Sequence, residues 1–128
     1  MLRLAYQRAS ANLTEAIANH GLTPMQFQTL LRLRQRGAMN QNELGRSVGM
    51  PPANIHATVR RLVAAGLVVT RSQPRDRRLT LVALTEAGEQ TLTDVLPIAD
   101  AADRATLSVL SPRERRTVMA LLRRLAAG

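Results

Sequence analysis

Arginines gather in one short stretch of this 128-residue sequence. Between residues 60 and 78 a single carboxylate, that of Asp76, opposes six guanidinium groups, which belong to Arg60, Arg61, Arg71, Arg75, Arg77 and Arg78. A guanidinium is planar and can donate two parallel hydrogen bonds, which suits phosphate groups and the edge of guanine. Like charges repel one another unless an anion lies between them. The stretch therefore indicates an anionic polymer as partner, with a solvated charged hairpin as the alternative.

The charge of the whole chain points the same way. It has 18 basic residues, all of them Arg, against 9 acidic residues, a formal net charge of +9. The absence of Lys in a chain rich in Ala and Leu is also what codon bias in a GC-rich genome produces. The net charge is the stronger indication, and it favours an anionic polymer over a small acidic substrate.

Other kinds of chemistry have little support. The chain has no Cys, and its two histidines, His20 and His56, are too far apart in sequence to share one helical face, so we expect no metal site and no cofactor. An enzyme using either His as a base is the alternative, but no nucleophile, carboxylate pair or glycine-rich phosphate loop accompanies them. No signal peptide and no apolar run of membrane-spanning length is present, so we expect a cytoplasmic protein with no membrane partner.

Apolar spacing and start and stop signals predict four helices in the first half of the chain, at about 2–19, 24–36, 41–48 and 52–65. Thr23 is expected to cap the second helix, with Pro24 as its first residue. Glu43 is expected to reach back to the backbone amide of Asn40 in a capping box. Pro51 and Pro52 fit only a helix entry, because both lack a backbone donor.

The second half reads as a hairpin and two helices. Strands are expected at 67–71 and 79–84 around a turn at 73–77, then a helix from Thr85 with a kink at Pro97, and a last helix from Ser111. The chain is thus expected to be one domain, mainly α with a small β-hairpin. Its winged helix-turn-helix would occupy 37–85, and N- and C-terminal dimerisation helices would lie in 1–36 and 86–128.

Four short motifs occur in a fixed order. They are Arg61-Leu-Val-Ala-Ala-Gly66-Leu-Val68, Asp76-Arg-Arg78, Leu84-Thr-Glu-Ala-Gly88 and Leu110-Ser-Pro-Arg-Glu114. In this order and spacing the sequence resembles the MarR family of bacterial transcription regulators. The resemblance implies a homodimeric winged-helix protein that binds duplex DNA as a regulator, expected to be a repressor, and responds to a small molecule. The alternative is an architectural DNA-binding protein that needs no ligand.

The resemblance also implies roles for residues of the expected recognition helix. Its outward polar positions, Asn54, His56 and Thr58, become candidates for contacts with base edges. Asn suits adenine, whereas His can donate to guanine or to a phosphate, and both roles stay open for His56. Arg60 and Arg61 are expected to contact the DNA backbone or to support the fold.

In the wing, Asp76 and Arg78 match the family's Asp-x-Arg pair, in which the Arg enters the minor groove and the Asp orients it. The alternative is a pair that merely links the two strands. Arg75 and Arg77 are expected to contact phosphates. The Pro51-Pro52-Ala53 entry departs from the family pattern, because relatives often carry polar residues there.

The terminal helices carry apolar stripes that suit a two-fold dimer, which would present two recognition helices to a pseudo-palindromic operator. In the family, a cleft beside the dimerisation part receives a small, often aromatic and anionic effector, and residues 2–8 resemble members that sense aromatic acids. Tyr6 and Ser10 lie one helical turn apart and are expected to face this cleft, with Met25 and Phe27 as its apolar wall. Arg3 and Arg8 are candidates to hold a carboxylate. The alternative is that Tyr6 and Phe27 belong to the core.

Overall fold

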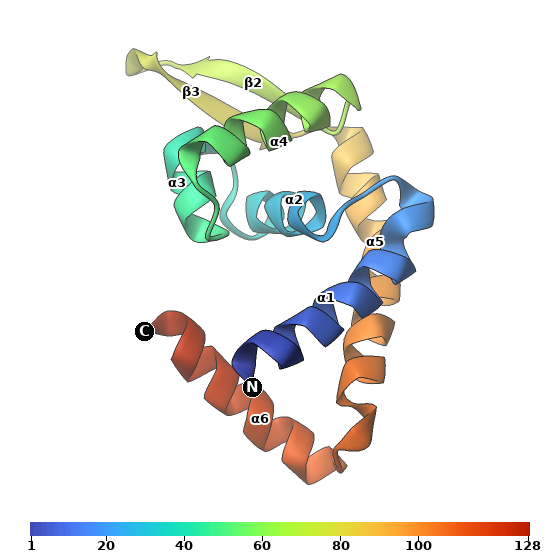
Figure 1. Cartoon of the computed structure of the whole chain (residues 1–128). Helices are drawn as coiled ribbons and strands as arrows, with labels where there is room; N and C mark the ends of the chain where they lie inside the picture. Colours follow the sequence, from blue (N-terminus) through green and yellow to red (C-terminus); the bar gives the residue numbers. More distant parts are fainter.

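The computed structural model describes the backbone of residues 1–128 and every side chain except that of Arg77. In chain order its elements are α1 (Leu2–Ile17), η1 (Ala18–His20), α2 (Pro24–Arg36), β1 (Met39–Asn40), α3 (Gln41–Ser47), α4 (Pro52–Ala64), β2 (Val68–Gln73), β3 (Asp76–Leu84), α5 (Glu86–Thr106), η2 (Leu107–Val109) and α6 (Pro112–Ala127). Figure 1 shows α4 and the β2–β3 hairpin at one end of the molecule and α6 at the other, with α5 running between them.

The helix starts follow the signals in the sequence, with one difference at α3, whereas α1 ends at Ile17, two residues earlier than expected, and continues into η1. Thr23 and Gln26 form a complete capping box at the start of α2, and Ser111 and Glu114 form another at α6. At α3 the side chain of Asn40 accepts a bond from the Glu43 amide at 2.9 Å, as expected. The prediction that Glu43 would bond to the backbone amide of Asn40 was wrong, because Glu43 Oε1 accepts a hydrogen bond from the Asn40 side chain instead. Asn40 is also the last residue of β1, where it pairs with Leu81 of β3. Its backbone therefore belongs to a strand, while its side chain caps a helix.

The sheet is larger than the hairpin that the sequence predicts. Its strand order is β1-β3-β2, with both pairs antiparallel. β1 was missed because two residues are too few for an alternating pattern. The hairpin strands also reach further toward the tip than expected, to Gln73 and from Asp76, with an irregularity in register after Ser72. The wing is therefore a longer ribbon with a shorter turn.

A single hydrophobic core joins α2 to the winged part. Phe27, Leu30 and Leu33 of α2 are buried in the same cluster as Ile55 of α4 and Val82 of β3. The division into a DNA-binding part at 37–85 and helical dimerisation parts remains a proposal. The core shows that α2 packs with the winged elements, and Ile17 of α1 and Leu92 of α5 belong to the same cluster.

The junction between the wing and α5 is held by close backbone contacts. Thr85 Oγ1 donates to the Gly66 carbonyl at 2.6 Å and accepts from the Gly88 amide at 3.0 Å. A Cβ added at Gly88 would overlap the carbonyl oxygen of Leu67, so only glycine fits there. The start of α5 is thus fixed to the end of the wing.

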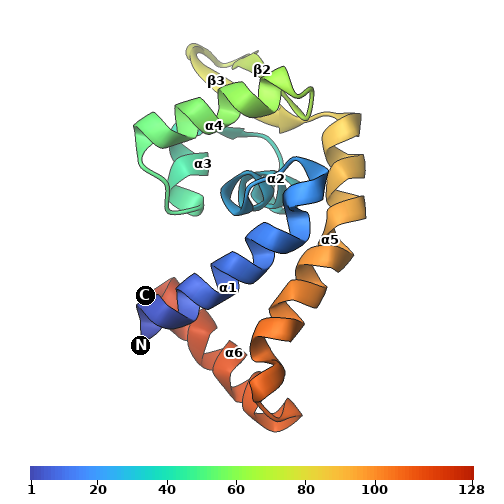
Figure 2. The same ribbon diagram turned by 45° about the vertical axis from the view of Figure 1, so that its right-hand side comes forward.

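A second contact ties α5 to α2. Arg34 Nε lies 2.8 Å from Glu89 Oε2, and Arg34 Nη2 donates to the Glu89 carbonyl and to Thr93 Oγ1 at 2.7 and 3.0 Å. From there α5 continues through Pro97 to Thr106 as one helix. Figure 2 shows α5 leading from the winged part to η2 and α6.

The far end of the molecule exposes apolar side chains. α1 packs along α5, where Asn12 Nδ2 donates to Thr106 Oγ1 at 2.8 Å. All of α6 is described, and none of its residues is buried. The exposed large apolar side chains at this end are Met1, Leu2, Leu4, Tyr6, Val109, Met119, Leu121, Leu122 and Leu125. Within the residues that the structure describes, no helix combines the length and apolarity needed to cross a membrane.

Candidate nucleic-acid interface and ligand cavity

The orientation of α4 is set by a buried stripe. Ile55, Val59 and Leu62 lie at helical spacing and are almost inaccessible to solvent. Thr58 falls on the same stripe, because it follows Ile55 by three residues. It is 8% exposed, and its hydroxyl lies 3.5 Å from Met50 Sδ, as a donor to that sulfur. The expectation that Thr58 faces outward was therefore wrong.

The opposite face of α4 is open to solvent. Asn54 and His56 are both exposed, as expected, but they are two residues apart and so roughly 200° apart around the helix. They lie on opposite flanks of the outward face, whose middle is occupied by Ala53, half-buried Ala57 and exposed Arg60. Sequence reasoning missed the two alanines, because it considered only polar residues. The positions on the side of the helix opposite the buried stripe would have identified them.

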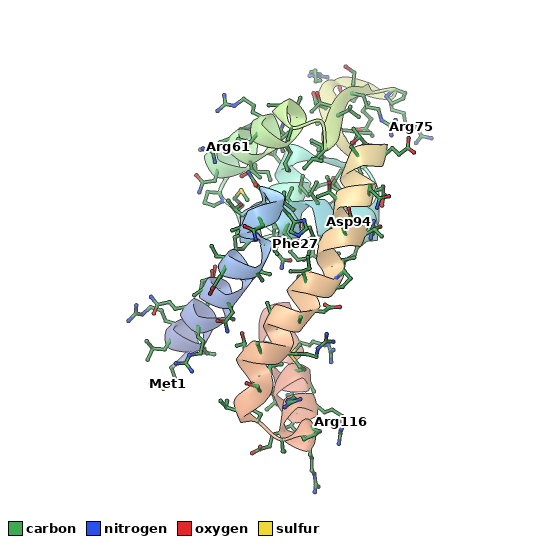
Figure 3. All side chains as sticks on the ribbon, turned by 90° about the vertical axis from the view of Figure 1, so that its right-hand side faces the viewer. Met1, Phe27, Arg61, Arg75, Asp94 and Arg116 are labelled. Atoms are coloured by element: carbon green, nitrogen blue, oxygen red, sulfur yellow. The ribbon has the colours of Figure 1, made fainter. Side chains whose placement is uncertain are left out.

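Arg61 is exposed and shares the flank of Asn54, seven residues away along α4. Figure 3 shows Arg61 and Arg75 at the end of the molecule opposite Met1 and Arg116. Arg60, Arg71 and Arg78 are also exposed on α4 and the two wing strands. The structure thus brings the arginines of α4 and the hairpin to one end of the chain, where their fields add.

At the tip of the wing, Asp76 and Arg78 interact within one strand. Asp76 Oδ1 accepts a hydrogen bond from the backbone amide of Arg78 at 3.0 Å and lies 3.5 Å from Arg78 Nε. The side chain of Arg78 is 94% exposed. This pair does not link the two strands, since both residues belong to β3. Arg75 is exposed in the turn, and the side chain of Arg77 lies outside the described part of the structure.

A cavity of about 710 Å³ lies beside α1 and α2, of a size typical of ligand pockets. Tyr6 and Ser10 line it from α1 and Met25 from α2, as the sequence predicted. Tyr6 is 67% exposed, so it does not belong to the core. Ser47 at the end of α3, and Val48 and Gly49 in the turn that follows it, line another side.

Phe27 does not line this cavity, so the prediction of its role was wrong. It is 3% exposed and belongs to the hydrophobic core, and Figure 3 labels it in the interior of the molecule. The reason is helical geometry, because Phe27 follows Met25 by two residues and so faces roughly 200° away. Gln28 and Arg32, three and seven residues after Met25, continue the cavity face of α2 instead.

Two charged side chains line the cavity among those that the structure describes, Arg32 on α2 and Asp103 on α5. Neither was singled out from the sequence, whereas the candidates Arg3 and Arg8 do not line it. Partial burial raises the pKa of Asp103 above its ordinary value, and the neighbouring charge of Asp100 raises it further. Over the described residues, no group of three His, Asp or Glu side chains is arranged to hold a metal ion.

The same fold and sequence pattern occur in known transcription regulators. The sequence model of the MarR family matches residues 20–79. The HTH-type transcriptional repressor NicR of Pseudomonas putida is 36% identical over 98% of this chain and 79% of its own length.

Two solved structures are similar over nearly the whole chain. A probable transcriptional regulator from Pseudomonas aeruginosa is 41% identical with a TM-score of 0.90, covering 97% of this chain and 92% of its own. BpsR of Bordetella bronchiseptica, whose DNA binding is regulated by 6-hydroxynicotinic acid, is 32% identical with a TM-score of 0.91, covering 99% and 91%.

Proposed function

The chain belongs to the MarR family of transcriptional regulators, and we propose that it represses transcription by binding a specific duplex DNA site, with an affinity that a small aromatic carboxylate lowers. The observation that carries the DNA-binding part is the outward face of α4. A buried stripe of Ile55, Val59 and Leu62 holds this helix so that its exposed arginines and those of the wing lie at one end of the molecule.

In this proposal α4 enters the major groove. Ala53 and Ala57 in the middle of the outward face permit close approach and can contact thymine methyl groups. Asn54 on one flank suits an adenine edge, and His56 on the other donates to a guanine edge or a phosphate. Arg61 on the flank of Asn54, and Arg60 further along the outward face, bind phosphates.

The wing would follow the adjacent minor groove. The guanidinium of Arg78 is almost fully exposed and free to enter a narrow groove, where the negative potential is enhanced. Asp76 holds the backbone amide of Arg78 and lies beside its Nε, which supports an orienting role for the carboxylate. Arg75 in the turn, and Arg77 beside it in sequence, contact phosphates.

A second copy of the chain would cover the apolar end. The apolar side chains of α1 and α6 are too exposed for a chain that acts alone in water, and none of the residues of α6 is fully buried. A two-fold dimer formed there would carry two α4 helices and read a pseudo-palindromic site with half-sites about 34–36 Å apart. Static light scattering at micromolar concentration would then give twice the mass of 14.0 kDa.

The effector would bind in the cavity lined by Tyr6, Ser10 and Met25. This cavity is lined both by α1, which carries part of the exposed apolar surface that it shares with α6, and by the turn between α3 and α4, which directly precedes α4. A ligand that fits one arrangement of these elements better than another shifts the balance between them. Tenfold weaker DNA binding needs about 1.4 kcal/mol of differential affinity. The regulation of BpsR by 6-hydroxynicotinic acid supports an aromatic acid as the class of ligand.

Fluorescence anisotropy with a selected operator and with random duplex DNA tests the DNA-binding proposal. Asn54→Ala should reduce the preference for operator over random DNA by about 1–3 kcal/mol. Arg75→Ala should weaken binding to both and reduce the salt slope by about 0.9, as one phosphate contact predicts. If the wild-type protein binds both DNAs equally and no aromatic acid changes the affinity, the protein is an architectural DNA-binding protein instead.

A further inference from the structure

The cavity contains a cation whose hydrogen bonds are incomplete. Arg32 is half-buried, and its Nε is buried with no hydrogen-bond partner among the described residues. The hydrogen bond recorded for its guanidinium is from Nη1 to Gln35 Oε1 at 3.2 Å. The ion pairs between described side chains do not include Arg32, unlike Arg34 on the same helix, which pairs with Glu89. Arg32 is thus a partly desolvated cation without an ion-pair partner among the described side chains.

A partly buried guanidinium destabilises the folded protein unless an acceptor takes its free N–H hydrogen bonds. A buried donor without an acceptor destabilises the folded state, and more so when it is charged. A carboxylate suits a guanidinium best, because its two oxygens accept two parallel N–H bonds. The rest of the lining offers apolar surface from Leu13, Met25 and Val48 and hydroxyls from Tyr6 and Ser10. This combination suits a flat aromatic ring that carries one carboxylate.

The other charged group limits which acids fit. Asp103 lines the same cavity from α5, so it would repel a second carboxylate on the ligand. A hydroxyl or ring N–H can instead donate to it. The favoured ligand is therefore a monocarboxylate, turned so that its acid group faces Arg32 and lies away from Asp103.

We propose that Arg32 binds the effector's carboxylate, and that Arg32 together with Asp103 selects aromatic monocarboxylates over dicarboxylates. The proposal rests on the effector part of the proposed function and names the residue that recognises the acid. It replaces Arg3 and Arg8, which do not line the cavity.

The position of Arg32 also connects ligand binding to the placement of α4. Arg32 belongs to α2, whose Phe27 and Leu30 share the core with Ile55 of α4. Tyr6 and Ser10 face the same cavity from α1. A ligand held by Arg32 on one side and α1 on the other fixes the winged part relative to the apolar end. The spacing of two α4 helices in a dimer then depends on whether the cavity is filled.

Isothermal titration of the 128-residue protein with 6-hydroxynicotinate and its uncharged carboxamide, 6-hydroxynicotinamide, tests the role of Arg32. Arg32→Gln should weaken 6-hydroxynicotinate binding roughly 10- to 100-fold, as loss of a charge-assisted hydrogen bond predicts, and should abolish the preference for the acid over the amide. Arg36→Gln, one turn further along α2 and exposed, removes the same charge and should leave both affinities unchanged. Arg8→Gln tests the alternative cation in the same way.

Asp103→Asn provides the second arm. It should bind pyridine-2,5-dicarboxylate several-fold more tightly than the wild-type protein does, because a repulsive charge has been removed. Thermal unfolding and operator binding of each variant check that it folds.

The possible outcomes separate the two proposals. If the wild-type protein binds 6-hydroxynicotinate and Arg32→Gln binds it equally well, Arg32 is not the carboxylate site, but the effector function stands. If Arg8→Gln loses the acid preference instead, the same conclusion holds. If the wild-type protein binds operator DNA but neither probe, both the role of Arg32 and an aromatic acid effector are wrong, while DNA binding stands.

Discussion

Gly88→Ala should destabilise the protein far more than its position in a helix suggests. An alanine in place of glycine inside a helix normally gains about 0.5–1 kcal/mol of stability. At Gly88 the new Cβ would lie closer to the Leu67 carbonyl oxygen than the 3.0 Å that real Cβ atoms keep, and 3.1 Å from both Leu67 C and Leu84 Cδ2. Two of these three neighbours are backbone atoms, so a side-chain rotation cannot relieve the overlap.

The size of the effect follows from what must move. The Leu67 carbonyl accepts a hydrogen bond from the Thr85 amide at 3.1 Å, and displacing it breaks that bond at a cost of about 1–3 kcal/mol. Overpacking of the backbone adds roughly 1–3 kcal/mol. After the helix gain of about 0.5–1 kcal/mol is subtracted, we expect a loss of about 1–5 kcal/mol in the free energy of unfolding. The melting temperature should then fall by roughly 10 °C.

Urea unfolding followed by circular dichroism measures this loss. One fixed protein concentration is needed, because the apparent stability of an oligomer depends on it. Ala87→Gly, an exposed neighbour in the same turn, is the control for helix propensity and should cost only about 1 kcal/mol. Gly45→Ala, whose Cβ would meet Met50 O at 3.1 Å and Ile55 Cγ2 at 3.2 Å, should lie between the two. A Gly88→Ala variant as stable as the wild type would refute the reasoning.

Three further predictions concern the candidate interface and the cavity. Thr58→Val should leave DNA affinity and specificity unchanged, and should change stability by about 1 kcal/mol because the bond to Met50 is lost. Altered discrimination between DNA sequences would show instead that Thr58 contacts DNA. Asp76→Ala should weaken operator binding although it removes a negative charge, because the amide and guanidinium of Arg78 lose their partner; tighter binding in an anisotropy titration would favour simple repulsion. Asp103→Asn should raise stability at neutral pH, because the raised pKa of Asp103 means that the folded state disfavours its ionised form. The gain should be present above the folded pKa and vanish as the pH falls through that pKa toward the ordinary value of 3.8; urea unfolding at several pH values checks it, and a constant gain contradicts it.

Much of the architecture follows from local rules in the sequence. Thr23, Asn40, Thr85 and Ser111 cap helices in the structure as their residue types predict. Capping depends on the backbone within three residues, so no distant part of the chain has to be known. The same holds for the hairpin, whose two strands flank a turn containing Pro74. Family membership was also predicted from ordered motifs, and the comparisons confirm it.

The sequence was less reliable where a residue's role depends on which side of a helix faces the core. Thr58 and Phe27 were assigned to an interface and a cavity, but both lie on buried stripes. A polar Thr suits a contact with DNA, and an aromatic Phe suits the wall of a ligand cavity. Residue type alone, however, does not reveal the direction in which the side chain points. The stripe on the same helix decides that direction.

The cavity itself depended on the tertiary structure. Its charged residues, Arg32 and Asp103, lie 71 positions apart in the sequence and meet only because α2 and α5 border the same space. Likewise, Gly88 is required because the Leu67 carbonyl approaches it from another element. Contacts of this kind carry no local signature, since the free energy of each depends on atoms that distant segments bring together. The sequence alone determined the helices, the hairpin and the charge of this protein, whereas packing between helices decided which side chains face solvent, the cavity or the core.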